Sequence, residues 1–237
     1  TMMHRAARVL KSAGPVALGG ALMGGVAFAS DDVLQPPSYP WEHTRYLTTY
    51  NAANLRRGFE VYSQVCATCH SLNLIAYRNF VGTFYSEAEA KIIAGQIEIE
   101  DGPGDDGEMF ERPGKLSDHL PAPYANEMQA RSINNGALPP DLSLMIKARH
   151  AREDYLFALL LGYKDPPVGV QVGEGQYYNP YFPGSKIGMP KQLQDGGVEY
   201  TDGTPATESQ MAKDLSEFLA WCSEPEADDR KRIALKW

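Results

Sequence analysis

Hydrophobic residues recur at helical spacing in several separate stretches of the chain. In residues 52–64, Leu55, Phe59 and Tyr62 fall on one side of a helix. Residues 207–210 have the sequence of a capping box and precede a second apolar stripe, which ends before Pro225. The stripe consists of Met211, Leu215, Phe218, Leu219 and Cys222. These patterns predict one helix at residues 52–64 and a closing helix near the C-terminus.

Shorter patterns predict further helices between those two. The sequence of residues 86–89 favours a capping box that opens a helix carrying Ile92 and Ile93. Helical spacing resumes at residues 127–133 and 141–149, and Gly162 ends the apolar stretch 155–161 from the C-cap position. Together the patterns predict an all-α fold.

Three segments show no such period. Residues 31–42 contain Pro36, Pro37 and Pro40 and are expected to form an extended lead-in. Residues 98–111 are rich in acidic residues and glycine, which indicates a surface loop. Residues 163–204 are rich in Pro, Gly and Tyr, and an irregular segment of that length in a folded domain is expected to carry function.

The first thirty residues form a separate unit. A basic stretch at residues 4–8 precedes an apolar run at 14–29 that ends in Ala27-Phe28-Ala29, the pattern of a cleavable leader. A membrane span needs about 20 apolar residues, whereas this run is shorter and is interrupted by glycines. We therefore interpret residues 1–30 as a targeting leader rather than an anchor, and residues 31–229 as the main domain.

The charge of the chain restricts the class of partner. Its formal net charge is −8, and because the leader is basic, the remainder carries −11. Such a surface repels the phosphates of nucleic acids and favours a basic protein partner. Of the three cysteines, Cys222 lies in an apolar run and is expected to be a small core residue.

The other two cysteines belong to the sequence Cys66-Ala67-Thr68-Cys69-His70. This is the C-x-x-C-H pattern that attaches haem covalently, since two thiols on one turn can each bond a haem vinyl group while the following imidazole ligates the iron. A structural zinc site would need four ligands, and no second pair of this kind occurs. A thioredoxin-like dithiol would need strands alternating with helices, which the pattern does not predict.

The candidates for the second axial ligand of such a haem are the remaining Met and His side chains. Met189 lies late in the long irregular segment, between Gly188, which allows close approach, and Pro190, which fixes the chain direction. His119 and His150 are the alternative imidazole ligands. The other methionines considered, which lie in the acidic loop or on helical patterns, are Met109, Met128, Met145 and Met211.

Several longer motifs give the chain a closer resemblance. They are PPSYPW (36–41), LRRGF (55–59), RPGKLSD (112–118), GALPPDLS (136–143), KARH (147–150), YNPYFPG (178–184) and DGTPAT (202–207). With these motifs the sequence resembles the mitochondrial cytochrome c1 family, the haem subunits of quinol–cytochrome c oxidoreductase (the bc1 complex). The resemblance runs from residue 36 to residue 236 and covers nearly the whole chain after the leader.

The resemblance implies a cytochrome c-like haem domain with one covalent haem c. In that family the methionine at the position of Met189 is the distal ligand, the arginine at Arg149 lies near a haem propionate, and the pair Pro139-Pro140 packs beside the haem. His70 and Met189 would then be the metal ligands, and Cys66 and Cys69 the covalent attachments. No residue would act as an acid, base or nucleophile of its own.

The resemblance also implies partners and a location. The electron donor would be the Rieske iron–sulfur protein and the acceptor soluble cytochrome c, within a dimeric complex that includes cytochrome b and other subunits. The domain would face the intermembrane space from the mitochondrial inner membrane. Residues 230–237 would begin the boundary of a C-terminal membrane helix, which the family carries and this sequence does not reach. A haem-based sensor or a peroxide-using enzyme, both with an open iron, are the alternatives.

Overall fold

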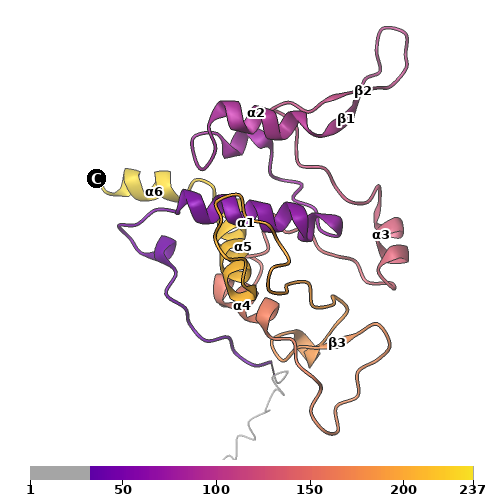
Figure 1. Cartoon of the computed structure of the whole chain (residues 1–237), viewed down its shortest axis with the longest axis vertical. Helices are drawn as coiled ribbons and strands as arrows, with labels where there is room; N and C mark the ends of the chain where they lie inside the picture. Colours follow the sequence, from indigo (N-terminus) through magenta and orange to yellow (C-terminus); the bar gives the residue numbers. More distant parts are fainter. Residues whose placement is uncertain (1–32, 237) are drawn as a thin grey trace, which may run out of the picture. The chain divides into compact units, whose positions relative to one another are not determined.

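Two helices far apart in the sequence cross at the centre of the domain. The computed structural model describes residues 33–236, and in it α1 (Ala52–Gln64) crosses α5 (Glu208–Ser223) (Figure 1). A Cβ atom at Gly58 would lie 2.3 Å from the carbonyl oxygen of Asp214 and 2.4 Å from Cβ of Phe218. The crossing is therefore so close that only glycine fits at residue 58.

Aromatic side chains fill the core around this crossing. Phe59 from α1 packs against Phe80 and Phe218, and the ring of Trp221 lies 4.9 Å from that of Phe84. Helix α4 (Arg152–Leu161) packs on α5 from another side. These buried rings remove a large apolar area from water, so the α1, α4 and α5 assembly forms the scaffold of the domain.

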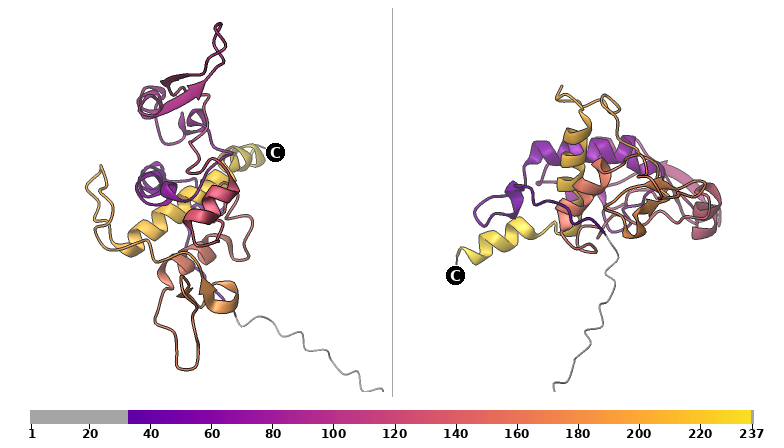
Figure 2. Two further views of the ribbon diagram at one scale, coloured as in Figure 1. Left: turned by 90° about the vertical axis from the view of Figure 1, so that its right-hand side faces the viewer. Right: turned by 90° about the horizontal axis from the view of Figure 1, so that it is seen from below.

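The remaining elements are short. The other helices are α2 (Glu87–Gly95), α3 (Glu127–Ile133) and α6 (Ala227–Ala234). The strands are β1 (Glu98–Asp101), β2 (Phe110–Pro113), β3 (Tyr177–Tyr178) and β4 (Lys186–Ile187), and the 3-10 turns are Glu42–Thr44, Cys66–Thr68, Tyr77–Phe80 and Pro183–Ser185. Strands β1 and β2 pair antiparallel, as do β3 and β4. The β1–β2 hairpin projects from the body beside α2 (Figure 2).

Most predicted helices are confirmed, with their caps. Ser86 accepts a hydrogen bond from the backbone of Glu89 in a complete capping box, and Thr207 accepts from the backbone of Gln210. The helix expected at residues 155–161 begins three residues earlier, at Arg152. The helices at 52–64 and 127–133 have the predicted bounds.

Three expectations need correction. The fold is mostly helical but not all-α, because two small antiparallel sheets are present. The acidic segment 98–111 contains strand β1 and the first two residues of β2. Residues 141–149 form turns instead of a helix, because Asp141 accepts from the backbone of Ser143 at 2.9 Å and of Asn73 at 2.7 Å, and these bonds fold the segment locally.

The predictions for the chain ends are tested only in part. The leader, 1–30, lies outside the described residues, so the division into a leader, a domain at 31–229 and a boundary at 230–237 stays a prediction. Among residues 33–236, none of the helices has both the length and the apolar character that a membrane crossing needs. The basic segment 230–232 lies on α6, a helix that the sequence patterns did not predict.

Candidate functional site

The C-x-x-C-H motif lies where α1 ends. The chain passes from α1 into the 3-10 turn Cys66–Thr68, and the backbone N–H groups of Cys69 and His70 both donate to the carbonyl of Cys66, at 3.1 and 2.9 Å. The hydroxyl of Tyr62, in the last turns of α1, donates to the carbonyl of His70 at 3.0 Å. Both thiols and the imidazole are therefore carried by one tight turn attached to the scaffold.

Cys66 and Cys69 form no disulfide and are partly buried. Burial, with a smaller effect of the neighbouring Cys69, raises the pKa of Cys66 to about 12. Within residues 33–236, no cluster of three or more His, Cys, Asp or Glu side chains could hold a metal ion. The donor set thus favours covalent haem over zinc.

The imidazole of His70 is held by one ring nitrogen. Its Nδ1 lies 2.8 Å from the carbonyl oxygen of Pro140, a hydrogen bond in which Nδ1 donates and Nε2 keeps its lone pair. Burial lowers the pKa of His70, and the bond to Pro140 opposes this effect only in part, which favours the neutral form of the ring. Histidines that ligate metals have this arrangement, with one nitrogen bonded to a backbone carbonyl and the other directed at the metal. His70 therefore fits the role of an iron ligand.

The Pro139-Pro140 pair is fixed next to the motif. Asp141, which follows the pair, accepts from the Ser71 hydroxyl at 2.8 Å and from the backbone of Asn73 at 2.7 Å. Pro139 is half-buried and Pro140 is exposed. The structure thus brings both prolines to the turn that carries His70, although they are 70 residues apart in sequence.

Met189 lies in a second segment that reaches this region. A Cβ atom at Gly188 would lie 3.4 Å from Cβ of Ala137, so the Met189 loop passes directly over the residues that precede Pro139. The partly buried side chain of Met189 packs in a cluster with Tyr155, Leu159 and Ile187. The contacts therefore join the Met189 loop, residues 137–140 and the His70 turn into one neighbourhood.

Arg149 lies at the edge of the same cluster. Its guanidinium is exposed, lies 6.0 Å from the centre of the Tyr155 ring, and donates to the carbonyl of Ala148 at 3.1 Å. Among residues 33–236 it forms no salt bridge, which leaves its positive charge available to an anionic group. This placement suits the propionate-binding role that the resemblance implies.

The alternative axial ligands lie in different surroundings. His119 and His150 are both exposed, and the backbone of His119 pairs with Ala76. Met145 and Met211 are buried in the main core, as expected of packing residues, whereas Met109 and Met128 are exposed. None of these side chains joins the cluster of Met189, and the assignment of Met189 as a ligand stays a prediction.

Two residues of this region were not singled out from the sequence. The hydroxyl of Tyr163 donates to the carbonyl of Met189 at 3.0 Å, and the fully buried Asn179 donates to the carbonyl of Leu159 at 2.7 Å. An Asn-Pro turn signal marks Asn179 in the sequence. No local signal marks Tyr163, because its partner lies 26 residues away.

The chain is similar to several known proteins over most of its length. Residues 41–237 match the model of the Cytochrome C1 family. The chain is 57% identical over 220 residues to cytochrome c1-2, heme protein, mitochondrial, of Solanum tuberosum, covering 91% of this chain and 85% of that protein. It is 59% identical over 204 residues to the Arabidopsis thaliana protein cytochrome c1 2, heme protein, mitochondrial, with coverage of 86% and 66%.

A fungal relative carries a different name. The mitochondrial cytochrome b-c1 complex catalytic subunit of Candida albicans is 56% identical over 209 residues, which cover 88% of this chain and 73% of that protein. The chain therefore belongs to the cytochrome c1 family.

Proposed function

We propose that this chain carries single electrons in the bc1 complex through one covalently bound haem c. Cys66 and Cys69 would form the thioether bonds, and His70 and Met189 would be the axial ligands. The observation that carries the proposal is the turn that presents both thiols and a neutral imidazole, whose Nδ1 is engaged by Pro140 at 2.8 Å. The haem, when bound, supplies the one-electron redox chemistry of its iron.

The chain's own residues bind and orient that group. The bond from His70 to Pro140 fixes the ring direction and leaves Nε2 as the ligand atom. Arg149 would bind a propionate with its exposed guanidinium, and Pro139 and Pro140 would pack beside the haem next to His70. Met189 would close the distal side with a thioether, which favours ferrous iron and raises the reduction potential.

The proposed partners follow from family membership and charge. Since a relative is named as the catalytic subunit of a cytochrome b-c1 complex, we place this chain beside cytochrome b and other subunits in a dimeric complex at the mitochondrial inner membrane, facing the intermembrane space. Its electron donor would be the Rieske iron–sulfur protein and its acceptor soluble cytochrome c. An acidic surface would raise the encounter rate with a basic acceptor.

Replacing Met189 by Leu tests the distal ligand. We expect a folded protein with a markedly lower reduction potential and a new spectral change on adding carbon monoxide to the reduced form, because the thioether no longer fills the sixth position. Met128→Leu is the matched control, since Met128 is 82% exposed on α3. If the reduction potential of Met189→Leu is unchanged, Met189 is not the distal ligand, and His119 or His150 takes that role instead.

The salt dependence of electron transfer tests the acceptor. Transfer to a basic cytochrome is expected to slow steeply as salt rises, because charges are screened over about 8 Å at physiological salt. Transfer to a neutral small oxidant should change little. Asp105, Asp106 and Glu108 are exposed near the tip of the β1–β2 hairpin. If their joint replacement by Asn and Gln leaves the salt slope unchanged, the steering charges lie elsewhere on the surface.

A further inference from the structure

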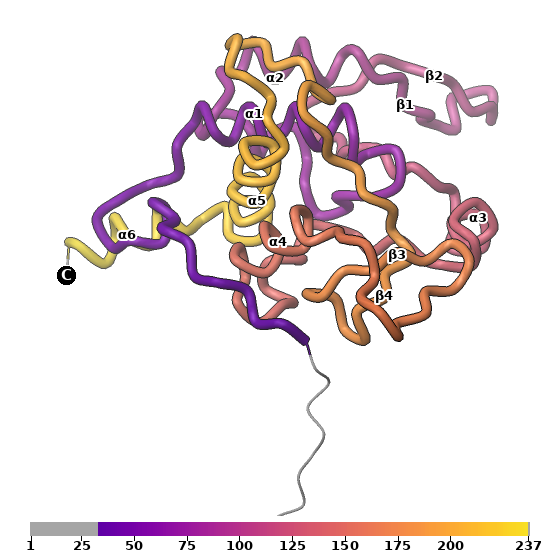
Figure 3. Tube along the Cα trace, turned by 60° about the horizontal axis from the view of Figure 1, so that its bottom comes forward, coloured from indigo at the N-terminus to yellow at the C-terminus, as the bar shows by residue number. Residues whose placement is uncertain are grey.

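The Met189 loop is attached to the C-terminal end of α4. Gly162, which follows α4, would have a Cβ atom 2.6 Å from the ring of Tyr181 and 2.9 Å from Oδ1 of Asn179. Its φ is −82°, so glycine is needed at residue 162 for space and not for a left-handed conformation. The β3–β4 unit thus packs directly on the end of α4 (Figure 3).

Asn179 anchors the near end of this unit. Its Nδ2 donates to the carbonyl of Leu159 at 2.7 Å, and its Oδ1 accepts from the backbone of Tyr181 at 3.1 Å. Its own backbone N–H donates to the carbonyl of Ser185 at 3.0 Å, which closes the turn before β4. The position of β4 is therefore determined by α4, and Met189 follows β4 by two residues.

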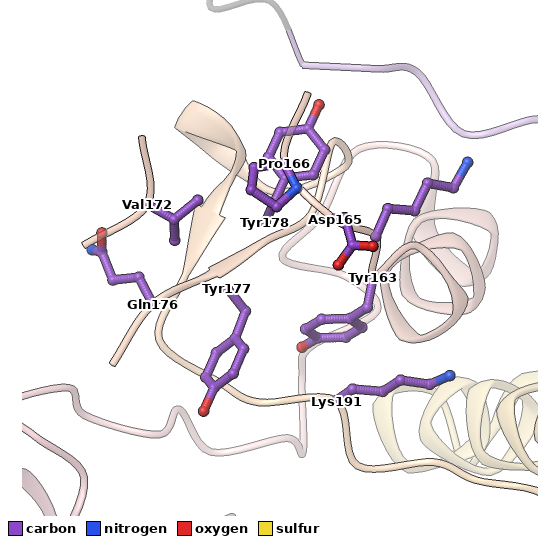
Figure 4. Close-up of a pocket in the computed structure, with 9 residues that line it drawn as sticks. Tyr163, Asp165, Pro166, Val172, Gln176, Tyr177, Tyr178 and Lys191 are labelled. Carbon is purple, nitrogen blue, oxygen red and sulfur yellow. The ribbon is translucent and has the colours of Figure 1, made fainter. Parts of the chain in front are cut away.

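Tyr163 makes the contact that reaches Met189 itself. Its hydroxyl donates to the Met189 carbonyl at 3.0 Å, and its ring packs in the cluster that includes the Met189 side chain. Burial raises the pKa of Tyr163, so the hydroxyl keeps its proton and remains a donor. The same ring lines an open cavity of about 450 Å³ together with Tyr177 and Lys191 (Figure 4).

We propose that Tyr163 is a positioning residue for the axial ligand, holding the Met189 backbone so that its thioether stays directed at the iron. This inference rests on the proposed role of Met189 as that ligand. The bond fixes the carbonyl of the peptide that joins Met189 to Pro190, and the ring of Pro190 restricts the next backbone angle. With both fixed, the direction of the Met189 side chain is limited to its own rotamers.

Removing only the hydroxyl tests the proposal. In Tyr163→Phe, we expect ferric protein to bind added imidazole about fivefold more tightly, because one hydrogen bond no longer opposes displacement of Met189. The long-wavelength absorption band of methionine-ligated ferric haem should weaken at lower imidazole concentration. Tyr177→Phe is the control, since this 43% exposed ring lines the same cavity and should leave imidazole binding unchanged.

Met189→Leu separates this inference from the proposed function. If Met189→Leu opens the iron to imidazole while Tyr163→Phe binds it with wild-type affinity, Tyr163 does not position the ligand and the inference is wrong. If Met189→Leu itself leaves imidazole binding unchanged, the ligand assignment fails instead. A fivefold effect shared by Tyr163→Phe and Tyr177→Phe would point to the cavity as a whole and would also overturn the inference.

Discussion

Two regions of the domain satisfy their polar groups in different ways. In the buried-charge region, formed by His43, Arg57, Glu153, Asp214 and Glu217, charged side chains from separate elements pair with one another. The carboxylate of Asp214 is fully buried and accepts from Nε and Nη2 of Arg57 at 2.8 and 3.2 Å. In the ligand region, formed by residues 66–70, 137–140 and 188–189, the principal bonds run from a side chain to a backbone carbonyl, as from His70 to Pro140.

The difference separates scaffold from site. The buried charges join α1, α4, α5 and the 3-10 turn Glu42–Thr44, so each charge is compensated within the protein. The ligand region consists of turns and loops. Tyr62 attaches it to α1, and Asp141 and Tyr163 join its segments to other loop residues. We infer that changes in the first region chiefly alter stability and that changes in the second chiefly alter haem ligation.

The largest effect on stability is expected for Arg57→Ala. This change leaves the fully buried carboxylate of Asp214 without its charged partner, which costs about 3–5 kcal/mol in buried pairs. Arg56→Ala, at the next position of α1, removes a pair with Glu89 in which both side chains are 42% exposed, so its effect should be much smaller. Denaturant unfolding measures both. If both variants lost the same unfolding free energy, the buried Arg57–Asp214 pair would be no more important for stability than the exposed Arg56–Glu89 pair.

Gly58→Ala should have the next largest effect. The added Cβ would lie within 2.4 Å of atoms on α5, so α1 and α5 must separate at their crossing, at a cost of about 2–3 kcal/mol. Gly95→Ala is the control, because nothing lies within 4 Å of a Cβ atom at Gly95. Thermal unfolding of the two variants should differ clearly, and a Gly58→Ala protein as stable as the wild type would contradict the close crossing.

The buried His43 predicts a pH dependence of stability. Its Nε2 lies 3.2 Å from Glu153 on α4, its Nδ1 lies 3.6 Å from Glu217 on α5, and its ring stacks on Tyr50 at 4.8 Å. Burial alone would lower the pKa of His43, but the two carboxylates outweigh it and raise that pKa above its ordinary value. The same interactions lower the pKa values of Glu153 and Glu217, against the opposing effect of burial.

The sign of the effect follows from these directions. Stabilisation by charged His43 is fully present below about pH 6.5 and is lost as the pH rises through the raised pKa of His43. Stabilisation by the carboxylates of Glu153 and Glu217 is present above about pH 4.5 and is lost as the pH falls below that value. The unfolding free energy of the wild type should therefore exceed that of His43→Gln most near pH 6, and less at higher pH. If the difference in unfolding free energy between the wild type and His43→Gln did not change with pH, His43 would not be charged in the folded protein. His150→Gln, at an exposed site, should match the wild type throughout.

Local signals explain which parts of the fold were predictable. The caps at Ser86 and Thr207 and the apolar stripe of α1 each depend on residues within a few positions, and these predictions are confirmed. Strands β1 and β2 were missed because their exposed, acidic residues lack an apolar alternation. Their pairing is supported instead by the ion pair of Arg112 on β2 with Asp101 on β1.

The site was predictable in its chemistry but not in its contacts. The spacing of Cys66, Cys69 and His70 indicated haem from the sequence alone. The bond from His70 to Pro140 and that from Tyr163 to Met189 join residues 70 and 26 positions apart, so no local pattern encodes them. The assigned ligands themselves stay predictions until the haem is examined directly.

Haem retention after unfolding tests the central claim that Cys66 and Cys69 hold a haem covalently. The protein is denatured, extracted with acid–acetone, and examined by a reduced-minus-oxidised spectrum. We predict that the haem spectrum stays with the wild-type polypeptide and is absent from the Cys66→Ala, Cys69→Ala double variant, because only thioether bonds survive these conditions. Haem released from the wild type, or retained by the double variant, would contradict covalent attachment at this turn.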